Sequence, residues 1–260
     1  MSEDNTLPVG RFVWHDLMTS DVPKALDYYR DLLGWEYKTA DMSGFQYNMI
    51  EVGGTEHGGF APLDPGPQQP HWTSYVVVPD VDAACAKATE LGGQVAVPPT
   101  DIPGEIGRFA VIVSPTGAPI SPYKPVHPKG DPTDMPAKGT FCWHELLSAD
   151  PDVDGPFFRE VFGWTGSSQE MGPMGTYHLF LRGEGRQTAG MLKNPQPGVP
   201  SAWVPYIAVD DVDATAKRVG ELGGKVWVAP QDIPDIGRFT VTSDPQGAMI
   251  AFFKGEMKAA

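Results

Sequence analysis

Short apolar runs with strand and helix spacing follow one another along the chain, with Gly- and Pro-rich turns between them. The first run, residues 12–18, is rich in aromatic and apolar side chains and has the length of a strand. Asp21 then suits a helix N-cap, and Pro23 suits the first helical turn. The helix carries an apolar stripe at i, i+3, i+4, i+7 and i+8 that ends before Gly34: Ala25, Tyr28, Tyr29, Leu32 and Leu33. The pattern predicts a strand and then an amphipathic helix.

Three strand-like runs complete this first unit, which therefore has the order βαβββ. They cover residues 35–38, 45–51 and 58–63. The same order returns at once. Residues 74–78 favour a strand, Asp80 caps a helix that Gly92-Gly93 closes, and three further strand-like runs cover 94–97, 108–113 and 119–123. Separate helices and strands in this order predict an α+β fold.

The whole pattern then repeats. Gly10–Asp21 returns as Gly139–Asp150 at an offset of 129, and Asp101–Phe109 returns as Asp232–Phe239 with one residue deleted. The conserved order of these blocks indicates a duplicated domain of about 120 residues and four βαβββ modules in all. We predict a first domain over 8–126 (modules 8–70 and 71–126), a linker over 127–137, and a second domain over 138–256 (modules 138–199 and 200–256).

The linker is polar and contains three prolines, so it can extend but cannot easily join a sheet. The pattern does not decide whether modules pair within one half or between halves. Because each half contains every core element, we expect residues 1–128 to fold alone.

Composition narrows the possible partners and compartments. A formal net charge of −14 argues against nucleic acid and against an anionic membrane surface. Two cysteines cannot form a disulfide framework, no apolar run reaches 18 residues, and the first residues lack a secretory signal. We therefore expect a cytoplasmic protein, monomer or homodimer, whose partner is a small molecule.

Several segments resemble one family. Residues 21–35 are similar to its first-helix signature, and Asp80-Val-Asp82 to the start of its second helix. Residues 114–117 and 244–247 resemble its turn before the last strand. The chain is thereby identified as a member of the vicinal oxygen chelate superfamily, which includes glyoxalase I, extradiol dioxygenases and bleomycin-resistance proteins. The resemblance implies two tandem domains whose incomplete-barrel sheets surround a cavity. It does not imply one reaction, because this fold carries several chemistries.

The resemblance also gives the positions of the family's metal ligands. In this sequence they fall on Trp14, Thr73 and Ser121 in the first half and on Trp143, Val204 and Ala251 in the second. Indole, valine and alanine cannot chelate a divalent cation. We therefore expect no metal cofactor. The alternative is a rearranged divalent-metal site on His15 and His144, with partners among Asp16, Glu51, His57 and His178. The competing interpretation is that both histidines are buried, hydrogen-bonded and structural.

The strand that opens each half places an acid two residues after a tryptophan, and alternation puts both on one face. Asp16 and Glu145 are the candidate acid/base residues. The candidate ligand-binding residues are Trp14, Tyr47, Tyr75, Arg108, Ser121, Tyr123, Trp143, Tyr177, Tyr206, Arg238 and Phe253. Large flat side chains with a few polar groups suit a planar aromatic ligand. The aromatic residues could equally fill the core, and the two arginines could bind a carboxylate, pair with Asp16 or Glu145, or be solvated.

These patterns leave three classes of function open. The first is a binding protein for an aromatic or antibiotic-like molecule, without the family metal site. The alternative is an enzyme of glyoxalase, lyase or hydroxylase type that uses Asp16, Glu145 or a rearranged metal site. The third is a structural protein with filled cavities. Metal analysis separates the first two, and an aromatic-ligand screen separates the third.

Overall fold

The computed structural model describes residues 6–42, 45–63, 66, 68–131, 136–172 and 175–256. Its first half contains two βαβββ modules. The first consists of β1 (Phe12–Thr19), α1 (Val22–Leu33), β2 (Glu36–Met42), β3 (Phe45–Val52) and β4 (Thr55–Pro62). The second consists of β5 (His71–Val77), α2 (Val81–Glu90), β6 (Gln94–Ile102), β7 (Gly107–Val113) and β8 (Pro119–Pro125).

The second half repeats this order. Its first module consists of β9 (Phe141–Ser148), α3 (Pro151–Phe162), β10 (Thr165–Glu170), β11 (Thr176–Arg182) and β12 (Arg186–Lys193). Its second module consists of β13 (Ala202–Ala208), α4 (Val212–Glu221), β14 (Lys225–Ile233), β15 (Gly237–Ser243) and β16 (Met249–Gly255). No helix among the described residues is long and apolar enough to cross a membrane.

Two eight-stranded mixed sheets result, one from each half. Their strand orders are β2-β3-β4-β1-β5-β8-β7-β6 and β10-β11-β12-β9-β13-β16-β15-β14. The first strand of each module pairs in parallel with the last, as β1 does with β4, whereas the hairpins between them are antiparallel. Neither order closes on itself, and the predicted α+β fold of βαβββ modules with incomplete-barrel sheets is confirmed.

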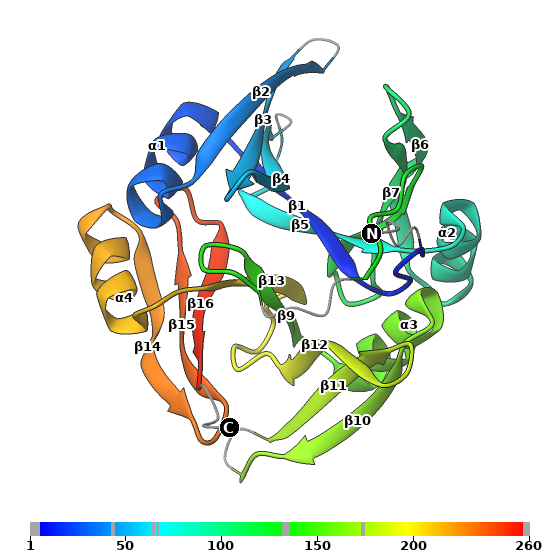
Figure 1. Cartoon of the computed structure of the whole chain (residues 1–260). Helices are drawn as coiled ribbons and strands as arrows, with labels where there is room; N and C mark the ends of the chain where they lie inside the picture. The colour runs from blue at the N-terminus through cyan, green and yellow to red at the C-terminus, as the bar shows by residue number, and fades with distance from the viewer. Residues whose placement is uncertain are drawn as a thin grey trace. The chain divides into compact units, whose positions relative to one another are not determined.

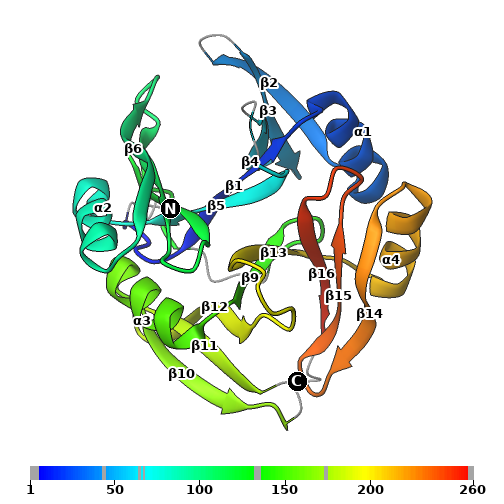
Figure 2. The ribbon, with the colours of Figure 1, turned by 180° about the vertical axis from the view of Figure 1, so that it is seen from behind.

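One helix packs on the strands of each module. Helix α2 contacts β6, β7 and β8, and α4 contacts the equivalent β14, β15 and β16 (Figures 1 and 2). The predicted helix ends are confirmed. The Asp21 carboxylate accepts a hydrogen bond from the Lys24 amide, and Gly34 ends the helix in the left-handed conformation at φ 72°. Buried Ala25, Tyr28 and Tyr29 lie on the predicted stripe.

Contacts divide the chain into two compact units. Unit 1 comprises Met1–Trp14, Ser74–Asp134 and His144–Trp203, and unit 2 comprises His15–Thr73, Met135–Trp143 and Val204–Ala260, each in its described part. Each unit has its own hydrophobic core, and each core draws on both halves of the chain. Phe12, Ile112 and Phe158 belong to the core of unit 1, and Trp35 and Phe252 to that of unit 2.

This division changes the expectation for an isolated half. The eight strands of each sheet come from one half, as the repeat implies. The apolar face of α2, however, packs into one core with Phe157 and Phe158 of α3. Residues 1–128 alone would therefore expose part of both cores to water, and the structure disfavours the prediction that they fold alone.

Candidate functional site

The candidate acid of the first half is held by a tyrosine. Asp16 lies on β1 with 8% of its surface exposed. The hydroxyl of Tyr47, on β3, donates a hydrogen bond to Asp16 Oδ1 at 2.5 Å. Such a short O–H···O contact is typical of a hydroxyl that donates to an ionised carboxylate. Two predicted site residues are thus in direct contact.

A glycine makes this contact possible. Asp16 is aligned with Gly59 of β4, and Gly59 is aligned with Met49 of β3. A Cβ at Gly59 would collide with the ring and hydroxyl of Tyr47, so the tyrosine occupies the space that a side chain would take. Gly53 and Gly54 lie in the turn between β3 and β4, where positive φ angles require glycine, and Gly58 and Gly59 lie within β4.

The second half repeats the arrangement with a glutamate, whose side chain is one carbon longer than that of aspartate. Glu145, half-buried on β9, accepts a hydrogen bond from the Tyr177 hydroxyl at 3.2 Å. Glu145 is aligned with Gly190 of β12, and a Cβ at Gly190 would collide with the Tyr177 hydroxyl. We call Asp16–Tyr47 and Glu145–Tyr177 the acid–tyrosine pairs. Their recurrence shows that carboxylate, tyrosine and glycine form one unit that was duplicated together.

The chemistry of a pair follows from its donors and acceptors. The tyrosine hydroxyl donates its only hydrogen to the carboxylate. A carboxylate has two oxygens, each of which can accept more than one hydrogen bond. An acid–tyrosine pair therefore suits a ligand that brings hydroxyl or amine donors.

Other predicted ligand-binding residues form small aromatic clusters. In unit 1, the ring centroid of Tyr75 lies 5.9 Å from that of Phe109 and 6.0 Å from that of Tyr123. In unit 2, the ring centroids of Tyr206 and Phe239 lie 6.5 Å apart. Two further contacts involve glycines: a Cβ at Gly107 would meet the Tyr123 ring, and a Cβ at Gly237 would meet the ring of Phe253, another predicted ligand-binding residue. Trp14 and Trp143 are half-buried.

Polar groups in the first cluster bind the backbone. The Tyr123 hydroxyl donates to the Ile106 carbonyl at 3.1 Å, and the buried Ser121 hydroxyl donates to the Ala110 carbonyl at 2.6 Å. Burial raises the pKa of the Tyr123 phenol. Ser121 therefore stabilises the pairing of β7 with β8, a role that the sequence alone did not indicate.

Each of the two predicted arginines forms ion pairs with two aspartates of its own half. Arg108 binds Asp82 through Nε at 2.8 Å and Nη2 at 3.1 Å, and binds Asp101 through Nη1 at 2.8 Å. Arg238 repeats this geometry with Asp213 and Asp232. The arginine bonds hold the pKa of Asp82 and of Asp213 below the ordinary value. Of the predicted alternatives, the structure favours solvated arginines that link a helix to an edge strand.

The histidines of the alternative metal site are buried against phenylalanines. His15 stacks on Phe141 at 3.6 Å between ring centroids, and His144 stacks on Phe12 at 3.7 Å. His15 Nδ1 lies 3.2 Å from the His57 carbonyl oxygen, which can only accept, so Nδ1 carries the hydrogen. Burial lowers the pKa of His15 to about 3. His15 is therefore neutral near pH 7, as a structural histidine would be.

The residues at the family's ligand positions do not fit a metal. Thr73 and Val204 are buried, Ala251 is fully buried, and the Ser121 hydroxyl is bound to a carbonyl. Within the described ranges, no group of three or more His, Cys, Asp or Glu side chains is placed to hold an ion. His178 of the alternative site instead has its Nδ1 2.9 Å from the Ser168 hydroxyl. The donor set of a His/Glu metal centre is not present at these positions.

Sequence reasoning missed two features of the site. Gly59 and Gly190 were not linked to the tyrosines, although each follows a second glycine or small residue at equivalent positions of both halves. Phe12 and Phe141 were not identified as stacking partners of the histidines, although the repeat places both three residues before a histidine. In both cases the recurrence of these residues in the two halves was the evidence in the sequence that could have indicated their role.

Comparison with known proteins identifies the family. The model of the Glyoxalase/Bleomycin resistance protein/Dioxygenase superfamily matches residues 11–120 and 145–252. "Putative glyoxylase CFP32" of Mycobacterium bovis is 39% identical over 246 residues, 93% of either chain. Anthracycline biosynthesis protein DnrV of Streptomyces peucetius is 34% identical over 139 residues, 48% of this chain and 50% of that protein.

Solved structures share the fold at low identity. The Mn(II)-bound glyoxalase from Novosphingobium aromaticivorans matches with a TM-score of 0.66 and 17% identity, over 95% of this chain and 82% of that one. The resemblance inferred from the sequence motifs is confirmed, and this chain belongs to the Glyoxalase/Bleomycin resistance protein/Dioxygenase superfamily.

Proposed function

We propose that the protein binds a planar, hydroxylated aromatic molecule through its acid–tyrosine pairs, without a metal at the family positions. The observation that carries this proposal is the tyrosine hydroxyl that donates to a carboxylate in each half. A carboxylate can accept several hydrogen bonds at once, so a carboxylate that binds a tyrosine hydroxyl is also suited to a ligand with O–H or N–H donors.

The class of ligand follows from hydrogen-bonding complementarity. Phenolic hydroxyls are donors on a flat ring, so they match both the acceptors of the pairs and the aromatic side chains of the predicted ligand set. The name of the Streptomyces relative, an anthracycline biosynthesis protein, supports the same class, because anthracyclines are polycyclic hydroxylated aromatics. The protein's own acidity gives it no attraction for polyanions.

The test is a fluorescence titration with a dihydroxyanthraquinone, followed through the intrinsic tryptophans. Asp16→Asn and Glu145→Gln keep the side-chain size but remove the ionised acceptor. We expect each to weaken one binding event by about 1–3 kcal/mol, the scale of one lost hydrogen bond to a charged group. Anthraquinone without hydroxyls is the matched ligand, and it should bind wild type and variants alike. Equal affinity of wild type and both variants for the dihydroxy compound would refute the proposal.

A second candidate uses the same residues as catalysts. Asp16 lies 2.5 Å from the Tyr47 hydroxyl, so a potential base and a potential acid are in direct contact. The name of the mycobacterial relative, "Putative glyoxylase CFP32", supports an enzymatic role. An enzyme of this kind would lose turnover in Tyr47→Phe while still binding its substrate. A binding protein would show no turnover at all, only a change in affinity.

A further inference from the structure

A cluster of arginines surrounds one carboxylate at the end of the first half. Asp131 accepts hydrogen bonds from Arg182 Nη1 at 2.6 Å and Nη2 at 2.9 Å, and from Arg186 Nη1 at 2.5 Å. Arg11 Nη1 lies 3.6 Å from Asp131 Oδ1, the oxygen that also accepts from Arg182 Nη2. We call Arg11, Arg182 and Arg186 the arginine cluster. Every member belongs to unit 1.

The cluster has more positive charge than Asp131 can neutralise. Burial alone would raise the pKa of Asp131, but the hydrogen bond and charge of Arg182 hold it below the ordinary value. Among the described residues, one ionised carboxylate therefore faces three guanidinium groups, an excess of two positive charges. Burial lowers the pKa of Arg11, the charge of Asp131 opposes this effect, and the charge of Arg182 adds to it. In a chain of net charge −14, such a local excess is a specific feature.

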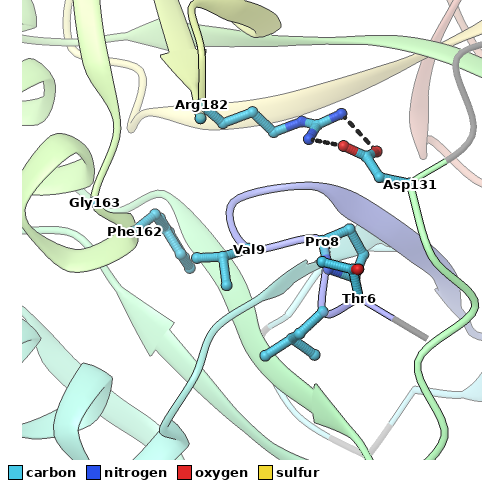
Figure 3. Close-up of a pocket in the computed structure, with 9 residues that line it drawn as sticks. Thr6, Pro8, Val9, Asp131, Phe162, Gly163 and Arg182 are labelled. Atoms are coloured by element: carbon cyan, nitrogen blue, oxygen red, sulfur yellow. Dashed lines mark hydrogen bonds and ion pairs between the residues drawn. The ribbon is translucent and has the colours of Figure 1, made fainter. Parts of the chain in front are cut away.

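A pocket of about 310 Å³ lies beside this cluster. Figure 3 shows the Arg182–Asp131 pair on one side of it and Val9, Pro8 and Phe162 on the other. The pocket thus has a charged wall and an apolar wall. The Arg182 side chain is only 12% exposed and that of Asp131 18%, so charges there are poorly screened by water.

The equivalent positions of unit 2 do not repeat the cluster. By the offset that relates Tyr47 to Tyr177, Arg182 corresponds to Val52, which also ends its strand. Arg186 begins β12 as Thr55 begins β4, and Arg11 corresponds to Thr140 by the offset of the opening strands. The same hairpin and strand therefore form without any cation. The hairpin and the opening strand therefore do not by themselves require arginine at these positions.

We propose that this pocket binds a small carboxylate with an apolar chain. The carboxylate would be held by N–H groups of the arginine cluster, whose guanidinium groups each have five donors, and the chain would pack on Phe162 and Val9. Asp131 acts as a tethered competitor that reduces the positive potential in the absence of ligand. This site is separate from the acid–tyrosine pairs and does not depend on their proposed function.

Isothermal titration calorimetry with hexanoate at low ionic strength tests this site in the full-length protein. Hexanol, which has the same chain without the charge, should bind at least tenfold more weakly. Arg186→Gln removes one charged donor from a half-exposed position and should weaken hexanoate binding by about tenfold. Asp131→Asn removes the competitor and should tighten binding, the opposite direction. Lys38→Gln, on an exposed ion pair, changes the net charge equally and should have no effect.

The outcomes distinguish a cluster that binds a ligand from one that only stabilises the fold. If the arginine cluster only stabilises the fold, the wild type should not bind hexanoate. Arg186→Gln and Asp131→Asn should then both be less stable than the wild type. Absence of binding by wild type, equal binding of hexanol, or equal affinity of Arg186→Gln and Lys38→Gln would each overturn the proposal. A folded Asp131→Asn protein that binds no more tightly would do so as well. Should that variant not fold, Arg186→Gln decides alone. Asp16→Asn should leave hexanoate binding unchanged, so failure here is distinct from failure of the acid–tyrosine pairs.

Discussion

At the scale of single residues, two carboxylates and two glycines define the candidate site. Asp16 and Glu145 could be predicted, because an acid recurs two residues after a tryptophan in both halves. Their tyrosine partners could be proposed only as members of a larger aromatic set. Gly59 could not be connected to Tyr47, because a register shift between Ile50 and Glu51 decides which residues of β3 and β4 face each other. Pairing registers with bulges are not encoded in local patterns.

The role of glycine gives a first prediction. Gly59→Ala places a methyl group where the Tyr47 ring lies, so it should displace the tyrosine and break the bond to Asp16. We expect a loss of about 1–3 kcal/mol in the free energy of unfolding, as for an overpacked site, together with weaker binding of the dihydroxyanthraquinone. Gly220→Ala on α4 is the control. It has open space around it and should be neutral or stabilising. Unchanged stability and affinity in Gly59→Ala would show that Tyr47 does not depend on this space.

Burial of His15 gives a pH dependence. Its folded pKa of about 3 lies below the unfolded value of 6.5. Between these values the unfolded chain binds a proton that the folded chain does not, so stability rises with pH in this window and is lost as pH falls below 6.5. The slope reaches about 1.4 kcal/mol per pH unit from this one group.

Urea unfolding of wild type and His15→Asn across this window measures the contribution. The asparagine amide can still donate to the His57 carbonyl but does not titrate in this range. We expect the variant to be less stable near neutral pH, where the stacking on Phe141 is lost, and to have a flatter pH profile. Parallel profiles for the two proteins would mean that His15 binds protons equally in the folded and unfolded states, which contradicts a pKa lowered by burial.

At the scale of elements, the sequence predicted the helices better than the strands. Helix α1 has a capping acid, a proline, an apolar stripe and a closing glycine that all agree. Strand β6 was predicted over 94–97, yet it extends to Ile102 through Pro98 and Pro99. Those prolines are tolerated because β6 is an edge strand whose pairing with β7 is interrupted at this point. The position of β6 at the edge of the sheet and the interruption of its pairing are set by the tertiary fold, which the local pattern does not show.

The arginine forks belong to the same scale. Arg108 joins Asp82 of α2 to Asp101 of β6, and Arg238 joins the equivalent acids of α4 and β14. These pairs are solvated, so we expect Arg108→Gln and Arg238→Gln to lower the melting temperature only slightly and to leave aromatic-ligand affinity unchanged. Differential scanning calorimetry and the fluorescence titration measure the two effects. A large loss of affinity with unchanged stability would restore the arginines as ligand-binding residues.

At the scale of the whole molecule, the duplication was evident from the sequence but the assembly of the cores was not. Phe12 is a strand residue of the first half, yet it contacts Trp164 and Trp203 of the second, with ring centroids 5.8 and 5.6 Å apart. Two identical patterns of apolar positions are compatible with pairing within or between halves. Only the packing of particular side chains distinguishes pairing within one half from pairing between halves.

This assembly predicts the behaviour of fragments. Residues 1–128 alone should unfold without a cooperative transition or self-associate, because a large part of each core is missing. Mixing them with residues 129–260 should restore the folded state. Circular dichroism and size-exclusion chromatography of the two fragments, alone and together, check both points. A monomeric 1–128 fragment with a cooperative melt would contradict the role given to the shared cores.

The most direct test of the account is a titration of the metal-stripped protein with a dihydroxyanthraquinone. The protein is treated with a chelator, and tryptophan fluorescence is followed for wild type and for the Asp16→Asn/Glu145→Gln double variant. The account predicts saturable binding by wild type without added metal, and affinity at least tenfold lower in the double variant. Binding that appears only when a divalent metal is restored, or that is equal in the two proteins, would contradict it.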